Sequence, residues 1–415
     1  MNSASATYPS LTEIAGALRK VTEILAHELA APARAVPCWT ESEWRIAQAA
    51  AAMQGVSSLL QHRLQWEGPD PWRQFLNEQE KQSLARHHQI AELLQSIDSQ
   101  SRLLGVPVMG LKGAALHAIG LYLPGERPMG DVDLLIEPRH SQAAAQLLRA
   151  CGYEAAFSSD RHLVFKPREA RAAPSGTFGE HADNPIKVEV HTEIAERLPF
   201  TKIDITASLL PKSWIGGLNT YPSNAALMRH LLMHAAGNMR ARALRLIQLH
   251  DIALLAVRFG PADWEELIAG QSGVHDPWWA WPPLILLARY YPAAIPASTI
   301  LRLSANCPWL LKRMAPKYRL TDVSWSNIRI AAFPGVEWSR TPRDAVGFMH
   351  SRIWPSRKVR LELKTGTAEI PGVATVPWYR IPHAFRILRW VFSRPPRVQT
   401  LLSVRAALGR GAEKQ

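Results

Sequence analysis

The chain has 415 residues, enough for two or three domains with their own cores, and 47% of its residues are hydrophobic. This composition, which includes 15 Trp, excludes a disordered chain. The sequence has no window of about 18 apolar residues that is free of charges and prolines, so we expect no transmembrane helix. The formal net charge is +13, and +10 of it follows residue 340, where 14 Lys or Arg stand against 4 Asp or Glu.

The cysteines and the first residues indicate a cellular compartment. Cys38, Cys151 and Cys307 are widely separated and lack the spacing of metal ligands, which fits a reducing environment. The first 20 residues contain charges but no apolar stretch typical of a secretory signal. We therefore expect a cytoplasmic protein.

Helical periodicity dominates the segment before residue 105. It extends over residues 11–29, 42–65 and 72–104, and prolines and a glycine separate these stretches. We expect a helical N-terminal region, residues 1–104, that supports the next domain and has no chemistry of its own.

Residues 104–137, LGVPVMGLKGAALHAIGLYLPGERPMGDVDLLIE, contain a Lys-Gly turn and an Asp-x-Asp pair that are separated by one short helix. The pattern predicts a buried strand at 106–109, a helix at 114–123 and a second strand at 131–136. The start of the helix has unpaired backbone N–H groups, which are suited to binding phosphate.

Strand geometry places the two aspartates together. Side chains alternate between the faces of a strand, so Asp131 and Asp133 should lie on one face, roughly 6 to 7 Å apart at Cα. In the same way, Glu189 and His191 should share a face of a later strand at 186–192. Carboxylate oxygens at these positions predict a site for Mg²⁺.

The elements after the Asp-x-Asp strand complete an α+β fold. We expect a helix at 140–151, strands at 153–157, 162–166 and 186–192, a linker or an irregular strand at 211–222, and a pair of helices at 224–259. This order suits a small mixed sheet with helices on one side. The predicted domains are a catalytic core at 105–222, a helical domain at 223–340 and a basic C-terminal region at 341–415.

Three sequence runs carry a family resemblance. LKGAAL, ERPMGDVDLLI and VEVHTE resemble the uncharacterised nucleotidyltransferase family of the polymerase-beta-like nucleotidyltransferase superfamily. The similarity extends from about residue 42 to about residue 260 and includes the helical run LLMHAAGNMRARALRLIQLHDIALLA. It implies a small mixed sheet of the polymerase-beta-like type, between helical regions, and transfer of a nucleoside monophosphate from an NTP with release of pyrophosphate. The superfamily usually has Gly-Ser at the turn, whereas Ala114 follows Gly113 here, so Lys112 and backbone amides would have to contact the triphosphate.

The resemblance and the chemistry of phosphate transfer together assign expected roles. Two Mg²⁺ ions, or alternatively Mn²⁺, would neutralise the attacking and leaving oxygens. The expected metal ligands and catalytic residues are Asp131, Asp133 and Glu189. The expected nucleotide-binding residues are Lys112, Gly113, Arg127, Gly130 and His191.

Several of the candidate residues also have a simpler interpretation. Glu189 could form a salt bridge on an exposed strand, Arg127 could pair with Glu126, and Lys112 could be merely solvated. His191 could orient Glu189, accept a proton from the acceptor, or be structural. Asp251 could pair with an arginine or take part in catalysis.

Two alternative functions remain at this stage. The protein could bind nucleotide as an accessory factor without turnover, or it could be an Asp-x-Asp glycosyltransferase that uses a nucleotide sugar. The intact acidic residues argue against the first alternative, and the Lys-Gly turn argues against the second. The acceptor, whether small molecule, peptide or protein, cannot be read from the sequence.

The basic C-terminal region contains the amphipathic run IPHAFRILRWVFSRPPR. Its arginines, Arg386, Arg389, Arg394 and Arg397, could form a solvated face, or they could bind an acidic partner or an anionic membrane surface. No nucleic-acid-binding module accompanies them, so nucleic acid is the less favoured partner.

Overall fold

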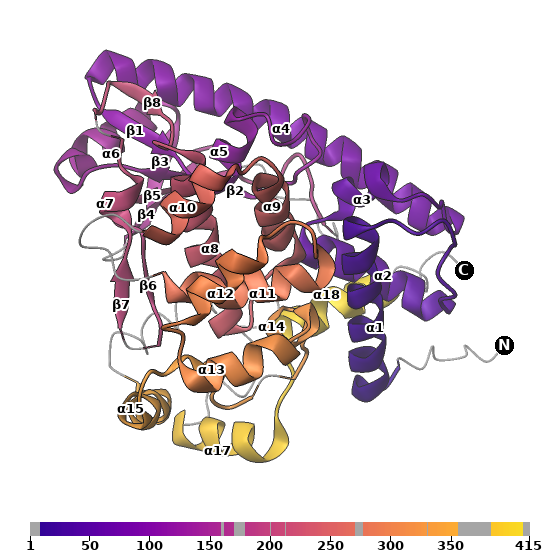
Figure 1. The fold of residues 1–415 in the computed structure, drawn as a ribbon. Coiled ribbons are helices and arrows are strands. Elements are labelled where there is room, and N and C mark those ends of the chain that lie inside the picture. Colours follow the sequence, from indigo (N-terminus) through magenta and orange to yellow (C-terminus); the bar gives the residue numbers. More distant parts are fainter. Residues whose placement is uncertain are drawn as a thin grey trace.

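The computed structural model describes residues 9–158, 162–169, 179–199, 201–211, 213–269, 277–329, 331–355 and 383–409. It is a mixed α+β structure, in which a sheet lies at one end and helices form the rest (Figure 1). Among the described residues, no helix combines the length and the apolar character needed to cross a membrane.

Six strands form the main sheet, in the order β3-β4-β5-β2-β1-β8. They are β1 (Pro107–Gly110), β2 (Asp131–Leu135), β3 (Tyr153–Ser158), β4 (His162–Pro167), β5 (Lys187–His191) and β8 (Gly217–Asn219). The pairs β2–β5 and β1–β8 are parallel and the other neighbours are antiparallel, which confirms the predicted mixed sheet. The edge strand β8 lies within the stretch 211–222, for which a linker or an irregular strand was expected, whereas the separate hairpin of β6 (Ala195–Arg197) and β7 (Lys202–Asp204) was not expected.

The N-terminal region is helical, as predicted. Its helices are α1 (Leu11–Ala30), α2 (Glu41–Gln54), α3 (Ser57–Arg63) and α4 (Asp70–Leu104). The helical periodicity predicted at 42–65 is divided between α2 and α3, because Gly55 adopts a left-handed φ of 70° that ends α2. The 35 residues of α4 run along one edge of the molecule, from α3 to the sheet (Figure 1).

Two short helices flank the acidic strand. Helix α5 (Lys112–Ala118) begins two residues earlier and ends earlier than the predicted helix at 114–123, since the chain turns at Gly120, where φ is 61°. Helix α6 (Ser141–Ala150) follows a short 3₁₀ turn and matches the predicted helix at 140–151 closely.

One face of the sheet packs on α4 and α6. Val132 and Val188 contribute to this core together with Ile97 and Leu147. The opposite face is not open, because Met109 and Leu135 join a second core that is shared with the helical part of the chain. Helices therefore cover parts of both faces, whereas the sequence predicted one.

The remaining helices surround the second core. They are α7 (Thr206–Leu209), α8 (Asn224–Ala241), α9 (Leu246–Val257), α10 (Pro261–Ala269), α11 (Trp281–Tyr290), α12 (Ala297–Ser304), α13 (Trp309–Met314), α14 (Leu320–Val323), α15 (Pro342–Ile353), α17 (His383–Ser393) and α18 (Val398–Gly409). The predicted pair at 224–259 corresponds to α8 and α9. Helix α18 packs against α2, so the end of the chain returns to the N-terminal helices. The domain boundaries after residues 104, 222 and 340 stay predictions.

Candidate metal-binding site

Adjacent parallel strands carry the acidic residues. In the register of β2 and β5, Asp133 lies opposite Glu189, and Leu135 lies opposite His191. Val132 and Val188 alternate with these residues and are fully buried on the other face. The alternation expected from the sequence therefore holds on both strands.

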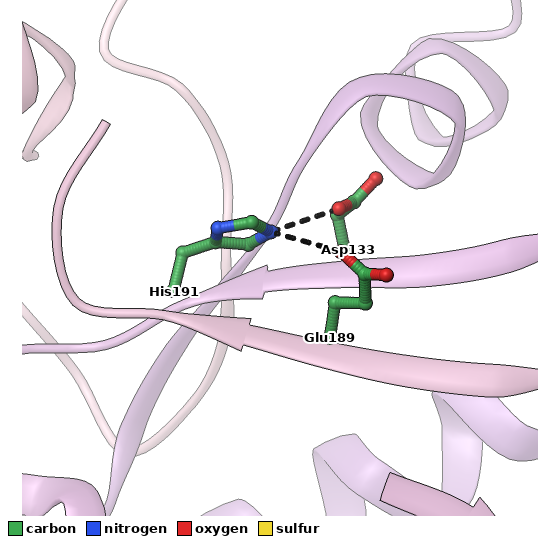
Figure 2. A group of neighbouring side chains, drawn as sticks. All are labelled: Asp133, Glu189 and His191. Atoms are coloured by element: carbon green, nitrogen blue, oxygen red, sulfur yellow. Dashed lines mark hydrogen bonds and ion pairs between the residues drawn. The ribbon is translucent and has the colours of Figure 1, made fainter. Parts of the chain in front are cut away.

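Asp133, Glu189 and His191 form a compact group (Figure 2). His191 Nε2 lies 2.9 Å from Asp133 Oδ1 and 3.8 Å from Glu189 Oε2. The ligand atoms of all three residues lie within 4.8 Å of one another. Two carboxylates and an imidazole at this separation could hold a divalent cation; carboxylates suit Mg²⁺, and the imidazole also suits transition metals.

Asp131 is not part of this group. It lies at the exposed start of β2, two residues before Asp133 and opposite Lys187. Although the residue is exposed, neighbouring groups crowd its carboxyl, and this desolvation together with the negative charge of Asp133 raises the pKa of Asp131.

Lys112, the first residue of α5, approaches the group. Its Nζ lies 3.0 Å from Asp133 Oδ1, and the backbone N–H of Leu111 donates to the carbonyl oxygen of Asp133 at 2.9 Å. Lys112 also has a positive φ of 44°, which is unusual for a residue with a side chain. The Lys-Gly turn is thus fastened to β2, and its ammonium group lies over the buried aspartate.

The charges in the group are not balanced. Burial disfavours the charge on Asp133, but Lys112 and His191 overcome this effect and hold its pKa well below the usual value. Burial and the charges of Asp133 and Asp131 raise the pKa of Glu189. Lys112 is in direct contact with Asp133, and the charges of Arg127 and Arg245 also act on Asp131, but the three carboxylates still repel one another, and a bound cation would relieve this repulsion.

Arg127 lies in a second, separate ion pair. Its Nε and Nη2 donate to the two carboxylate oxygens of Asp251 at 2.7 and 2.8 Å, and Tyr122 Oη donates to the same carboxylate at 2.7 Å. Asp251 is 2% exposed. The expected arginine partner of Asp251 is therefore Arg127, and the possible pairing of Arg127 with Glu126 is wrong because Glu126 faces Arg63 instead.

Gly113 permits the close packing of this second pair against the turn. A Cβ at Gly113 would lie 2.7 Å from Arg127 Nη1 and 3.1 Å from Met129 Sδ. No neighbour lies within 4 Å of the Cβ position of Gly130, so space is open beside the backbone just before Asp131.

One buried arginine near the site was missed by the sequence reasoning. Arg86 of α4 is 2% exposed and donates to the carbonyl oxygens of Met129 and Gly130, both at 3.2 Å. It precedes the buried Ile90 by four residues, so it occupies the inward face of α4. A charge on that face is the signal that could have identified it.

Strands β2 and β5 carry a group able to bind a metal ion. The nearby Lys-Gly turn is part of the sequence pattern that resembles nucleotidyltransferases. The model of the uncharacterised nucleotidyltransferase family matches residues 40–276, which is more than half of the chain, and the chain belongs to this family. No curated protein and no solved structure matches the chain.

Proposed function

We propose that the protein is a cytoplasmic, Mg²⁺-dependent enzyme that transfers a nucleoside monophosphate from an NTP to an acceptor and releases pyrophosphate. The observation that carries this proposal is the pairing of Asp133 with Glu189 across two parallel strands, beside Lys112, in a member of a nucleotidyltransferase family. The acceptor is a small molecule, a peptide or a protein.

In the proposed enzyme, Asp131, Asp133 and Glu189 hold Mg²⁺, with Mn²⁺ as a substitute. Bound metal would supply positive charge to the attacking and leaving oxygens during transfer. His191 contacts both Asp133 and Glu189, so it is suited to fixing their orientation or to acting as a further ligand. The repulsion among the three carboxylates supports this role, because a bound cation would relieve it.

Lys112, Gly113, Arg127 and Gly130 would contact the nucleotide. Lys112 would exchange Asp133 for the phosphates when metal binds, since a lysine acts as a mobile point charge. Arg127 cannot offer its full fork, because Asp251 occupies Nε and Nη2. Nη1 lies against Gly113 and, among the described residues, donates only to the Pro128 carbonyl, at 3.4 Å. We assign the phosphate contact of Arg127 to this nitrogen.

A screen of the four NTPs with Mg²⁺ and candidate acceptors tests the proposal. We expect one NTP to release pyrophosphate and the acceptor to gain the mass of the nucleoside monophosphate. An accessory protein would bind the NTP without either product. A glycosyltransferase would instead bind a nucleotide sugar and transfer the sugar, and either result would contradict nucleotidyl transfer.

We also propose that α17 rests on an anionic membrane surface. Its side chains Phe385, Leu388 and Phe392 are 63%, 54% and 80% exposed, and their spacing places them on one outward face. Ile387, 5% exposed, points inward, and Arg389 is exposed beside the apolar face. An apolar face bordered by arginine is suited to the boundary between lipid headgroups and acyl chains.

The arginines of the basic region differ in whether they could contact a membrane surface. Arg394 is exposed, whereas Arg397 donates to the Arg242 carbonyl at 2.6 Å and lies over the Trp325 ring, so it is part of the fold. The side chain of Arg386 and all of residues 356–382, which hold further basic and aromatic positions, lie outside the described residues.

Vesicle binding by the full chain tests this surface. Binding to vesicles with phosphatidylserine should exceed binding to neutral vesicles and should fall steeply with salt. The double variant Phe385→Ser, Phe392→Ser should lose most of the binding, whereas the control Leu301→Ser, at an exposed leucine of α12, should keep it. Equal binding by both variants, or binding only to an acidic peptide or single-stranded RNA, would overturn the membrane assignment.

A further inference from the structure

Helix α4 presents a row of polar side chains to the loop that leads into β5. Gln79, Gln82 and Arg86 are three and four residues apart, so they share one face of the helix. Gln79 Nε2 donates to the Glu180 carbonyl at 3.2 Å, and its Oε1 accepts the Glu180 N–H at 2.8 Å. Gln82 Oε1 accepts the N–H of Ala182 at 2.7 Å. The helix thus binds the loop backbone much as a neighbouring strand would.

Gly179 allows this close approach. Its φ is +88°, and a Cβ there would lie 2.2 Å from Gln79 Oε1. No other residue type fits both the conformation and the space.

Arg86, the last residue of this row, contacts a second loop as well as the loop before β5. Its Nε and Nη2 donate to the carbonyls of Met129 and Gly130, the two residues before Asp131. Its Nη1 donates to the carbonyls of His181 and Asn184 at 3.1 and 2.6 Å. Every nitrogen of the guanidinium is therefore used, and the acceptors belong to two separate segments of the chain.

Those two segments lead directly into β2 and β5. Gly130 precedes Asp131, the first residue of β2, and Asn184 lies three residues before Lys187, the first residue of β5. The side chains of the metal-binding group come from these two strands. Glu180 balances the buried charge, with its Oε2 3.2 Å from Arg86 Nε. A planar guanidinium with fixed donors holds several acceptors in one geometry, which a flexible lysine does not.

We propose that Arg86 is a positioning residue that sets β2 and β5 in the register needed for Asp133 and Glu189 to share a metal ion. This role rests on the proposed function, because it concerns the geometry of the same site. It also makes α4 part of the active site's framework, although the sequence predicted only a passive helical support. Partners that orient metal ligands typically contribute about 10–100-fold to metal affinity.

Hydrogen exchange and Mn²⁺ binding by the full chain test the proposal, with the variants Arg86→Lys and Arg86→Met. Amides of residues 127–136 and 180–191 should exchange at least about tenfold faster, because both loops lose their common anchor. Mn²⁺ affinity, measured by calorimetry, should fall about 10–100-fold. If Arg86→Met does not fold, Arg86→Lys carries the test, since it keeps the charge beside Glu180.

Arg229→Met is the matched control. Arg229 of α8 is 1% exposed and donates to the Glu266 carbonyl at 2.8 Å, away from both loops. It should alter neither the exchange of the two loops nor Mn²⁺ affinity. Unchanged exchange and affinity in Arg86→Lys would overturn the proposal, as would a lower melting temperature with unchanged affinity. Failure of the wild type to bind Mn²⁺ would instead count against the proposed function, while the exchange data would still test Arg86.

Discussion

Two buried cation–carboxylate pairs lie near each other in this protein, and they differ in how completely the cation neutralises the carboxylate charge around it. Arg127 and Asp251 form a two-point pair, and Tyr122 donates to the same carboxylate. Lys112 makes a single contact with Asp133, which faces the further negative charges of Asp131 and Glu189. Asp251 is therefore neutralised without a ligand, whereas Asp133 lies beside two further carboxylates whose repulsion a bound cation would relieve.

This difference indicates that the Arg127–Asp251 pair mainly stabilises the fold, whereas the group around Lys112 and Asp133 is suited to binding and catalysis. A planar fork that matches both oxygens of a carboxylate, like that of Arg127, is suited to joining α9 to the loop before β2. A single lysine contact that could be exchanged for a phosphate is suited to a binding site. The comparison predicts that breaking the first pair reduces stability, and that changing the second group reduces metal binding and turnover.

The largest expected effect on stability comes from Asp251→Asn. The change leaves Arg127 buried without its counter-charge, which typically costs about 3–5 kcal/mol of unfolding free energy. Urea denaturation measures this loss. Glu265→Gln, which removes an exposed partner of Arg302, should cost much less. Similar small losses in both variants would show that the Arg127 pair is not a structural anchor.

Glu189→Gln should reduce kcat about 10²–10³-fold and leave NTP affinity nearly normal, because the residue acts mainly in the transition state. Transfer to the acceptor found by the NTP screen and calorimetric titration with the NTP measure the two quantities. Glu193→Gln is the control, since Glu193 lies beyond β5 in an ion pair with Lys202. An inactive Glu193→Gln with an active Glu189→Gln would contradict the assignment.

The sequence predicted strands β1 to β5, the mixed sheet and the faces of Asp133, Glu189 and His191, because alternation along a strand is a local property, but it did not predict the hairpin of β6 and β7. It did not predict that Asp251 would pair with Arg127, since these residues are 124 positions apart and meet only through tertiary packing. Arg86 was missed for the same reason, because its acceptors are backbone carbonyls of two distant loops. The break at Gly55 was missed because the apolar pattern continues across it.

A smaller effect should appear as a dependence of stability on pH. Burial lowers the pKa of His250 to about 4. Its Nε2 is buried and has no hydrogen-bond partner in the part of the chain that the structure describes, while Nδ1 lies 2.9 Å from Tyr291 Oη. The unfolded chain has a histidine pKa of about 6.5, so the stability from neutral His250 is fully present above that pH and is lost as the pH falls towards 4.

Unfolding free energies at pH 7 and pH 5 check this expectation. The wild type should lose roughly 1–2 kcal/mol more than His250→Gln between these values, because the variant has no proton to take up on unfolding. Equal losses in the two proteins would show that His250 does not titrate on unfolding.

The most direct test of the central claim is the melting temperature with and without Mg²⁺ plus ATP, for the wild type, Asp133→Asn and Asp344→Asn. Asp344 is the control because it caps α15, at the end of the molecule opposite the sheet (Figure 1). A ligand that binds only the folded state raises the melting temperature, so we predict a rise for the wild type and for Asp344→Asn and little or none for Asp133→Asn. An equal rise in all three proteins would contradict a metal and nucleotide site at Asp133.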